Sequence, residues 1–170
     1  MVPPIKILII EDDTTIRRIL TDILEIEGFE TITAVNGRLG IQIAQTHLPT
    51  LIICDIVMPI VDGYGVLRAL RQNSVTAPIP FIFLTGNALA ANREELMNGA
   101  DDYLIKPIIV SELLKAIAEQ LQKQTDVRRS ADDSFNAFHL DGLDRYYTHQ
   151  EEAAKSPLTS GVPIVPRYTE

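Results

Sequence analysis

The chain of 170 residues has one cysteine, no tryptophan and no cluster of basic residues. Cys54 cannot form an internal disulfide, and its apolar neighbours indicate a core residue rather than a reactive thiol. The 23 acidic residues outnumber the 15 basic ones, and the net charge is −8. Because binding to a phosphate backbone needs clustered Lys and Arg, we expect no direct DNA binding. The cysteine content favours the cytoplasm.

Long hydrophobic runs are also missing. No stretch is long enough to span a membrane, and MVPPIKILII at the amino terminus is too short for a signal peptide. We therefore expect a soluble, unprocessed protein with no membrane partner. Hydrophobic residues still make up 46% of the chain, which is enough for a sizeable core.

Short apolar runs alternate with segments of helical spacing. The runs, which predict buried strands, lie at 5–10, 29–35, 51–55, 80–85 and 101–106. The helical segments lie at about 14–27, 37–48, 64–72, 87–99 and 111–124. This alternation predicts an α/β fold, a doubly wound parallel sheet of five strands with five helices.

Polar side chains stand at the ends of four of these strands. They are Glu11 and Asp12 after the first strand, Asp55 after the third, Thr85 after the fourth and Lys106 after the fifth. Parallel strands all finish at one edge of a sheet, so we expect these residues to converge in one pocket. Taken alone, Asp55 could merely cap a loop.

The chemistry of such a pocket follows from its charges. Two carboxylates 4 Å apart repel each other by about 4 kcal/mol at an effective dielectric near 20, so the group needs cations. Lys106 supplies one, and a cluster with oxygen ligands only suits Mg²⁺. A carboxylate such as Asp55 can attack phosphorus, while the metal, the lysine and the Thr85 hydroxyl neutralise the transferred group.

Four segments, IIEDDTTIRRIL, CDIVMPIVDGYGVL, FIFLTGN and ADDYLIKP, resemble successive motifs of the receiver domain of bacterial two-component response regulators. The similarity covers about residues 5–124. It implies the flavodoxin-like strand order 2-1-3-4-5 that the chemotaxis receiver has. It also implies a role in phosphorelay signal transduction rather than enzymatic turnover, because receivers of this family hydrolyse their own aspartyl phosphate slowly and act on no external substrate.

The resemblance assigns the metal site residue by residue. Asp55 is the phosphoacceptor and a metal ligand. Asp12 would bind Mg²⁺ directly, Glu11 would help hold it through water, and the backbone carbonyl of Val57 would complete the protein's ligands. Asp13, one place beyond the acidic pair, is better explained as a favourable charge at the start of a helix.

The same resemblance assigns the phosphoryl contacts and the switch. Thr85 would bond a phosphoryl oxygen, Lys106 would pair with the phosphoryl group, and Tyr103 matches the switch aromatic, although it could equally be a core residue. The implied partners are a histidine kinase or histidine phosphotransfer protein as donor and a downstream protein as target. A homodimer through the fourth helix, fifth strand and fifth helix is a further implied contact.

Composition changes after residue 124. Residues 1–124 are predicted to form the receiver domain, and 125–170 an acidic, flexible tail that is mostly irregular. Within it, the aromatic residues from Phe135 to Tyr147 approach helical spacing, so a docking segment is an alternative. The tail is too short and too acidic for a DNA-binding output domain, which indicates a receiver that stands alone.

Two functions from different classes remain. The first is a phosphorylatable switch, and the second is a receiver-shaped binding module that works without phosphorylation. The complete set of pocket residues favours the first, since a degenerate receiver would have lost at least one of them. A phosphatase with an aspartyl intermediate is a more distant alternative.

Overall fold

The computed structural model describes residues 4–86, 99–127, 129 and 130. The chain divides into two units, 1–125 and 126–170. Nearly all of the second unit lies outside the described residues, including the segment from Phe135 to Tyr147, so the character of the tail stays a prediction. In the part of the chain that is described, no helix has both the length and the apolar character needed to cross a membrane.

The five strands form one parallel sheet in the order β2-β1-β3-β4-β5, as the resemblance implied. Their bounds are β1 Lys6–Ile10, β2 Glu30–Ala34, β3 Leu51–Asp55, β4 Phe81–Thr85 and β5 Asp102–Ile105. The three strands β1, β3 and β4 are buried almost throughout, because helices cover both of their faces. Consecutive apolar residues are therefore their signature, and each run was visible in the sequence.

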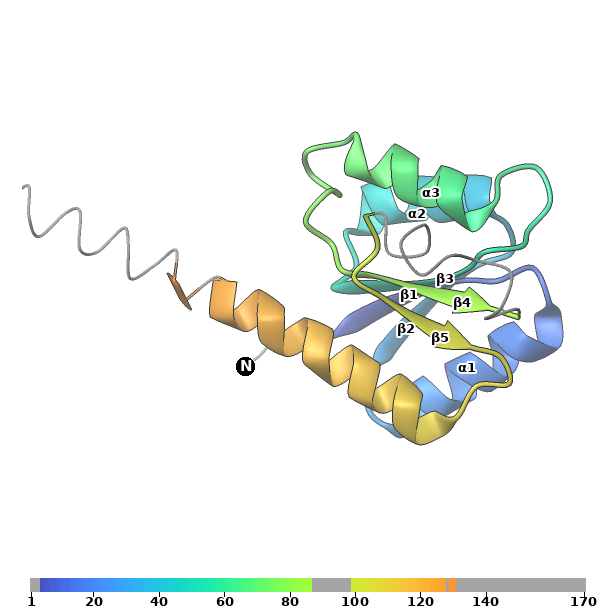
Figure 1. The fold of residues 1–170 in the computed structure, drawn as a ribbon. Helices are drawn as coiled ribbons and strands as arrows, with labels where there is room; N and C mark the ends of the chain where they lie inside the picture. Colours follow the sequence, from blue (N-terminus) through green and yellow to red (C-terminus); the bar gives the residue numbers. More distant parts are fainter. Residues whose placement is uncertain (1–3, 87–98, 128, 131–170) are drawn as a thin grey trace, which may run out of the picture. The chain divides into compact units, whose positions relative to one another are not determined.

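Four helices are described where the sequence predicts five. They are α1 Thr14–Ile26, α2 Gly37–His47, α3 Gly63–Arg71 and a helix at 110–127. The predicted helix at 87–99 falls almost entirely on 87–98, which lie outside the described residues. Figure 1 shows α2 and α3 on one face of the sheet, with α1 and the helix at 110–127 on the other.

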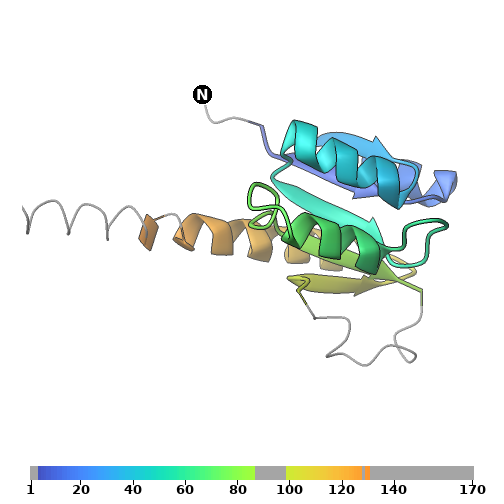
Figure 2. The ribbon, with the colours of Figure 1, turned by 90° about the horizontal axis from the view of Figure 1, so that it is seen from above.

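Alternate residues of the strands fill two separate cores. Phe81 and Phe83 of β4 pack edge to face on the α2 and α3 side, 5.1 Å between ring centroids. Ile82 and Leu84 point to the opposite side, where Leu113 of the carboxyl-terminal helix joins the second core. Seen from above, α2 and α3 lie over the strands of the sheet (Figure 2). The three inner strands can thus bury both faces and still bring their carboxyl ends to one edge of the sheet.

The helices α1, α2 and α3 each start at an acidic or amide cap. Asp13 caps α1, and its side-chain oxygen accepts hydrogen bonds from the backbone N–H groups of Thr15 and Ile16 at 2.7 and 3.0 Å. The carboxylate bonds directly to two amides at the positive end of the helix, which confirms the role expected for Asp13 and lowers its pKa. Thr14 lies inside the helix rather than capping it.

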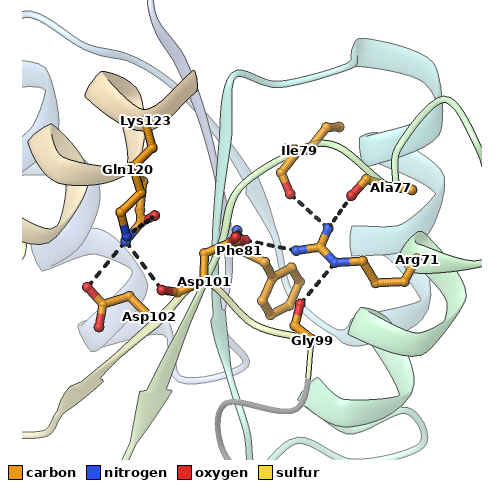
Figure 3. A network of polar contacts seen from close by, with 9 residues as sticks. All are labelled: Arg71, Ala77, Ile79, Phe81, Gly99, Asp101, Asp102, Gln120 and Lys123. Atoms are coloured by element: carbon orange, nitrogen blue, oxygen red, sulfur yellow. Dashed lines mark hydrogen bonds and ion pairs between the residues drawn. The ribbon is translucent and has the colours of Figure 1, made fainter. Parts of the chain in front are cut away.

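A polar network ties the amino-terminal edge of the sheet together (Figure 3). The Arg71 guanidinium at the end of α3 donates to the carbonyl oxygens of Ala77, Ile79 and Gly99 and to Oδ2 of Asp101, all at 2.8 to 2.9 Å. The same Asp101 oxygen accepts from the N–H of Phe81 at 2.8 Å. The network therefore fixes the starts of β4 and β5, the two strands whose far ends carry Thr85 and Lys106.

We expect Asp101→Ala to lower the free energy of unfolding by about 2–3 kcal/mol, because Phe81 is fully buried and its N–H would lose its side-chain acceptor. The matched control is Asp22→Ala, which removes an exposed contact to Arg18 at 4.0 Å and should change stability by less than about 0.5 kcal/mol. Urea unfolding measures both. Equal losses in the two variants would show that the network contributes no more than a surface ion pair.

Candidate functional site

Backbone hydrogen bonds continue past the ends of the strands at the carboxyl edge. The N–H of Glu11 donates to Ala34 at 3.1 Å, and the N–H of Lys106 donates to the carbonyl of Thr85 at 2.7 Å. Beside Asp55, the N–H of Ile56 donates to Leu84 at 3.0 Å. The first residue beyond each of these strands is therefore held as firmly as the strand itself. This brings the predicted strand-end side chains to one edge.

Lys106 joins two carboxylates at the centre of this edge. Its Nζ lies 2.8 Å from Oε2 of Glu11 and 3.1 Å from Oδ1 of Asp55. The Glu11 side chain is 1% exposed, that of Asp55 8% and that of Lys106 19%. These are buried ion pairs rather than surface ones, so the loss of any partner would leave an uncompensated charge in a poorly hydrated site.

Burial and pairing move two pKa values. Desolvation raises the pKa of Glu11 and the Asp55 carboxylate adds to the rise, while the hydrogen bond from Lys106 opposes it. For Lys106, burial alone would lower the pKa, but the hydrogen bonds and charges of Glu11 and Asp55 outweigh burial, and the pKa is raised from its ordinary value of 10.5. The ammonium group is thus a fixed positive charge throughout the neutral range.

Asp12 completes an acidic cluster. One carboxylate oxygen from each of Glu11, Asp12 and Asp55 lies within 4.8 Å of the others, and the Asp12 side chain is exposed. Lys106 is the one cation that forms ion pairs with members of this group among the described residues, so the three carboxylates and the ammonium group together retain a net charge of about −2. An oxygen-only set with that charge fits a hard divalent ion.

Arg17 supports the acidic loop, and its role was not anticipated from sequence. Its guanidinium Nη1 donates to the carbonyl oxygens of Glu11 and Asp12 at 2.7 and 3.2 Å. Those two bonds fix the backbone from which both carboxylates project. The sequence held a signal for this contact. Arg17 lies near the start of a helix whose first turn has no acidic residue, where a positive charge opposes the helix dipole. An arginine at such a position implies a nearby hydrogen-bond acceptor.

Gly63 shapes the loop that follows Asp55. A Cβ at this position would lie 2.5 Å from the carbonyl oxygen of Asp55, and the N–H of Gly63 donates to Ile56 at 2.9 Å. The start of α3, capped by Asp62, therefore packs directly against the end of β3. Only glycine permits so close an approach, which explains the Asp-Gly pair seen in the sequence.

The remaining predicted residues lie near the cluster but outside it. Thr85 is buried at the end of β4, on the strand next to Asp55. Alternation along β4 and β5 places Thr85 on the same face of the sheet as Tyr103, whose ring is partly buried against the core. Val57 follows β3 with its side chain exposed. The roles of Thr85 and Tyr103 in switching, and of the Val57 carbonyl in metal binding, stay predictions.

Comparison with known proteins agrees with this arrangement. The model of the response regulator receiver domain family matches residues 7–118. A relative in Pyropia yezoensis, named "Probable transcriptional regulator ycf27", is 39% identical over 126 residues, covering 74% of this chain and 51% of the relative. The DNA-binding dual master transcriptional regulator RpaA of Synechocystis is 36% identical, covering 74% and 53%. "Probable transcriptional regulator ycf29" of Porphyra purpurea is 30% identical, covering 92% and 76%.

Solved structures resemble the fold over the same region. A chemotaxis protein of Vibrio cholerae has a TM-score of 0.65 and 29% identity, covering 69% of this chain and 98% of that one. The receiver domain of a sensor histidine kinase from Pseudomonas aeruginosa has a TM-score of 0.66 and 26% identity, covering 71% and 99%. The latter structure holds a magnesium ion coordinated in its active site cleft.

The relatives correct one expectation. We expected no direct DNA binding, and this is contradicted by relatives that are named transcriptional regulators, one of them DNA-binding. The chain spans about half the length of the ycf27 relatives and of RpaA, so the acidity of a receiver carries no information about nucleic-acid contacts made by the other half. With a receiver-family match over 7–118 and the acidic cluster and lysine at the edge where its motifs place them, the chain belongs to the response regulator receiver domain family.

Proposed function

We propose that this chain is a phosphorylatable switch of a two-component system and that Asp55 accepts a phosphoryl group from a phosphohistidine. One observation carries the proposal. Lys106 lies within hydrogen-bond distance of both Glu11 and Asp55, and the Asp12 carboxylate stands beside them in the same cluster. That grouping leaves the acceptor, a fixed cation and an acidic metal site together at one sheet edge.

The transfer would proceed by attack of an Asp55 carboxylate oxygen on phosphorus. The new O–P bond forms as the P–N bond to the donor imidazole breaks, and the electron pair of that bond returns to the imidazole nitrogen. The other ring nitrogen of the donor carries a proton, so the imidazole leaves as the neutral ring. Asp12 would bind Mg²⁺ directly, with Asp55 and the Val57 carbonyl as further ligands and Glu11 acting through water. Bound Mg²⁺ would neutralise charge on the phosphoryl oxygens.

Lys106 and Thr85 would hold the phosphorylated state. The Lys106 ammonium can exchange part of its contact with Asp55 for a phosphoryl oxygen, and the Thr85 hydroxyl stands on the neighbouring strand. Movement of Thr85 would make room for Tyr103, which lies on the same face of the sheet, to change rotamer. This change would alter the surface that consists of strand β5, the last helix and the segment that follows β4. That surface would bind a downstream protein or a second copy of the chain.

The switch has no external substrate in this proposal. Its aspartyl phosphate would be lost by slow self-hydrolysis, which times the signal rather than turning over a metabolite. The single cysteine is buried and forms no disulfide, and we retain the cytoplasm as the proposed compartment.

Control of transcription is the proposed output. The relatives named as transcriptional regulators support it, and the likeness to the ycf29 protein covers 92% of this chain, a share that necessarily extends well past residue 125. The resemblance to a regulator therefore does not stop where the receiver domain does. The kinase or phosphotransfer partner is inferred from the chemistry of the acceptor.

Incubation of the full chain with Mg²⁺ and phosphoramidate, followed by intact mass measurement, tests the proposal. We expect one phosphoryl group to be added, and none when a chelator is present in excess. The alternative, a receiver-shaped binding module, predicts no added mass under either condition. Labelling that proceeds equally well in chelator would contradict the metal assignment.

A further inference from the structure

Arg17 holds both peptide groups that flank the α-carbon of Asp12. Its guanidinium Nη1 donates to the carbonyl oxygen of Glu11 at 2.7 Å, and that oxygen belongs to the peptide between residues 11 and 12. The same nitrogen donates at 3.2 Å to the carbonyl oxygen of Asp12, which belongs to the peptide between residues 12 and 13. A planar peptide leaves two soft torsions at each residue, and the orientations of the flanking peptides set both of them. The contacts of Arg17 therefore fix the direction in which the Asp12 side chain leaves the backbone.

Asp12 depends on this backbone more than the other two carboxylates of the cluster do. Both oxygens of Glu11 accept hydrogen bonds, one from Lys106 Nζ at 2.8 Å and the other from the backbone N–H of Asp13 at 3.2 Å. Asp55 pairs with Lys106 at 3.1 Å. The Asp12 carboxylate is exposed, and within the described part of the chain it forms no hydrogen bond or ion pair. Its place beside the other two carboxylates is consequently set through its backbone.

The charge of Arg17 does not account for its place beside the acidic loop. A guanidinium group stays protonated and has no acceptor atom, so it cannot itself bind a cation. Its positive charge opposes the dipole at the start of α1 and repels a divalent ion at the nearby carboxylates. Nη2 makes a further contact of 3.3 Å to the Thr14 hydroxyl, which holds the guanidinium in its orientation. The favourable contribution of Arg17 is therefore the order that its hydrogen bonds give to the loop.

We propose that Arg17 is a positioning residue that sets the affinity of the acidic cluster for Mg²⁺. The inference rests on the proposed function, in which Asp12 binds the metal directly. Mg²⁺ demands near-ideal octahedral geometry, so a ligand whose direction varies binds it less tightly. Removing a group that orients a metal ligand typically lowers metal affinity by about 10- to 100-fold. We expect the lower end, because the N–H of Asp13 still contacts Glu11 and because loss of a positive charge acts in the opposite direction.

Titration of the full chain with Mg²⁺, followed through the amide chemical shifts of residues 11–13, tests this role. Arg17→Ala should raise the dissociation constant about tenfold relative to the unmodified chain. Arg17→Lys keeps the charge, but its compact, strongly hydrated ammonium group lacks the planar geometry of the guanidinium, and we expect a rise of about threefold. Arg17 is partly exposed, so the melting temperature of each variant in chelator should stay within about 5 °C of that of the unmodified chain.

Arg18→Ala is the matched control for charge. Arg18 is the next residue of α1, its side chain is 82% exposed, and it contacts Asp22 one turn further along the helix at 4.0 Å. The substitution removes the same charge without removing a hydrogen bond to the acidic loop. The dissociation constant for Mg²⁺ should therefore stay within about twofold of that of the unmodified chain.

Labelling by phosphoramidate at increasing Mg²⁺ gives a second measurement. The Mg²⁺ concentration that gives half-maximal labelling should rise about tenfold in Arg17→Ala, and labelling should recover as more Mg²⁺ is added. A residue that merely stabilised the fold would leave this concentration unchanged.

The inference is overturned if Arg17→Ala binds Mg²⁺ as tightly as the unmodified chain, or if Arg18→Ala weakens binding to the same extent. It is also overturned if Arg17→Lys binds Mg²⁺ with full affinity, because the charge and not the geometry of the guanidinium would then set the affinity. In each of these cases the unmodified chain still binds Mg²⁺ and is labelled, so the proposed function stands. An unmodified chain that neither binds Mg²⁺ nor takes phosphate would refute the proposed function, and this inference with it.

Discussion

Asp55→Asn should abolish phosphorylation of the chain by phosphoramidate in Mg²⁺. Asparagine occupies nearly the same volume, so the end of β3 and its close contact with Gly63 should survive. The amide oxygen is a far weaker nucleophile than a carboxylate, and the variant also loses the ion pair that joins Asp55 to Lys106 at 3.1 Å. Intact mass should show the unmodified mass only, at donor concentrations that label the natural chain completely.

The matched control is Asp13→Asn. This residue lies in the same acidic run, but its carboxylate accepts the N–H groups of Thr15 and Ile16, and asparagine caps helices equally well. Labelling should therefore persist. Asp12→Asn alters the metal cluster, so the extent of its labelling should lie between those of Asp55→Asn and Asp13→Asn and should increase at higher Mg²⁺. Full labelling of Asp55→Asn would show that another residue of the chain is the phosphoacceptor.

Much of this architecture is readable in the sequence, because parallel strands buried on both faces must be apolar throughout and their ends must meet at one edge. That argument alone brings Asp55 and Lys106 together across 51 positions of sequence. The order of the strands did not follow from it and came from resemblance to a family. The helix at 110–127 was predicted to begin one residue too late and to end three residues too early, since polar residues continue a helix as readily as they end one.

Other features could not have been read from local pattern. Asp13 and Thr14 are both good caps in adjacent positions, and only the backbone decides between them. The partners of Arg71 include Gly99 and Asp101, 28 and 30 positions away, and no periodicity encodes such a contact. For Ile60 the sequence predicts the wrong backbone conformation. A β-branched side chain disfavours a positive φ, and the loop after β3 nevertheless gives Ile60 a φ of 72°.

The DNA-binding expectation was wrong for a different reason. Net charge is a legitimate argument about the surface of the domain that carries it. The acidic pocket and the surrounding chain supply that charge here, whereas the relatives are about twice as long as the segment matched. A charge balance drawn from a receiver could not describe contacts made by another part of a regulator.

Lys106→Met should be among the most destabilising substitutions outside the apolar core. It leaves Glu11, 1% exposed, and Asp55, 8% exposed, without the cation that lies 2.8 and 3.1 Å from them. Removing one partner of a buried ion pair costs about 3–5 kcal/mol in the free energy of unfolding, and we expect the lower end because the Asp12 side of the cluster is open to water. Urea unfolding at pH 7 in chelator measures it.

The matched control is Lys6→Met, which breaks a contact of 3.1 Å to Glu30 between two partly exposed side chains. Its effect should stay below about 1 kcal/mol. The double variant Glu11→Gln with Lys106→Met should recover much of the lost stability, since one buried carboxylate is then removed along with its cation. Additive losses in the double variant would show that the two residues do not act as a pair.

The pH dependence has a defined sign. In the folded chain burial raises the pKa of Glu11 above its ordinary value of 4.5, and Lys106 opposes the rise. Without Lys106 that pKa should be higher still. Between pH 7 and 4.5 the folded variant would then bind more protons than the unfolded one, so its stability should increase as the pH falls, more steeply than that of the natural chain.

At alkaline pH the natural chain, rather than the variant, is the protein whose stability changes through Lys106. The raised pKa of Lys106 stabilises the natural chain fully below 10.5, and this contribution is lost as the pH rises through the higher folded value. Lys106→Met has no such contribution to lose, so the stability difference between the two proteins should be largest near neutral pH and shrink in both directions. A difference that stays constant from pH 5 to pH 11 would mean that Lys106 contributes through packing of its methylene chain and not through its charge.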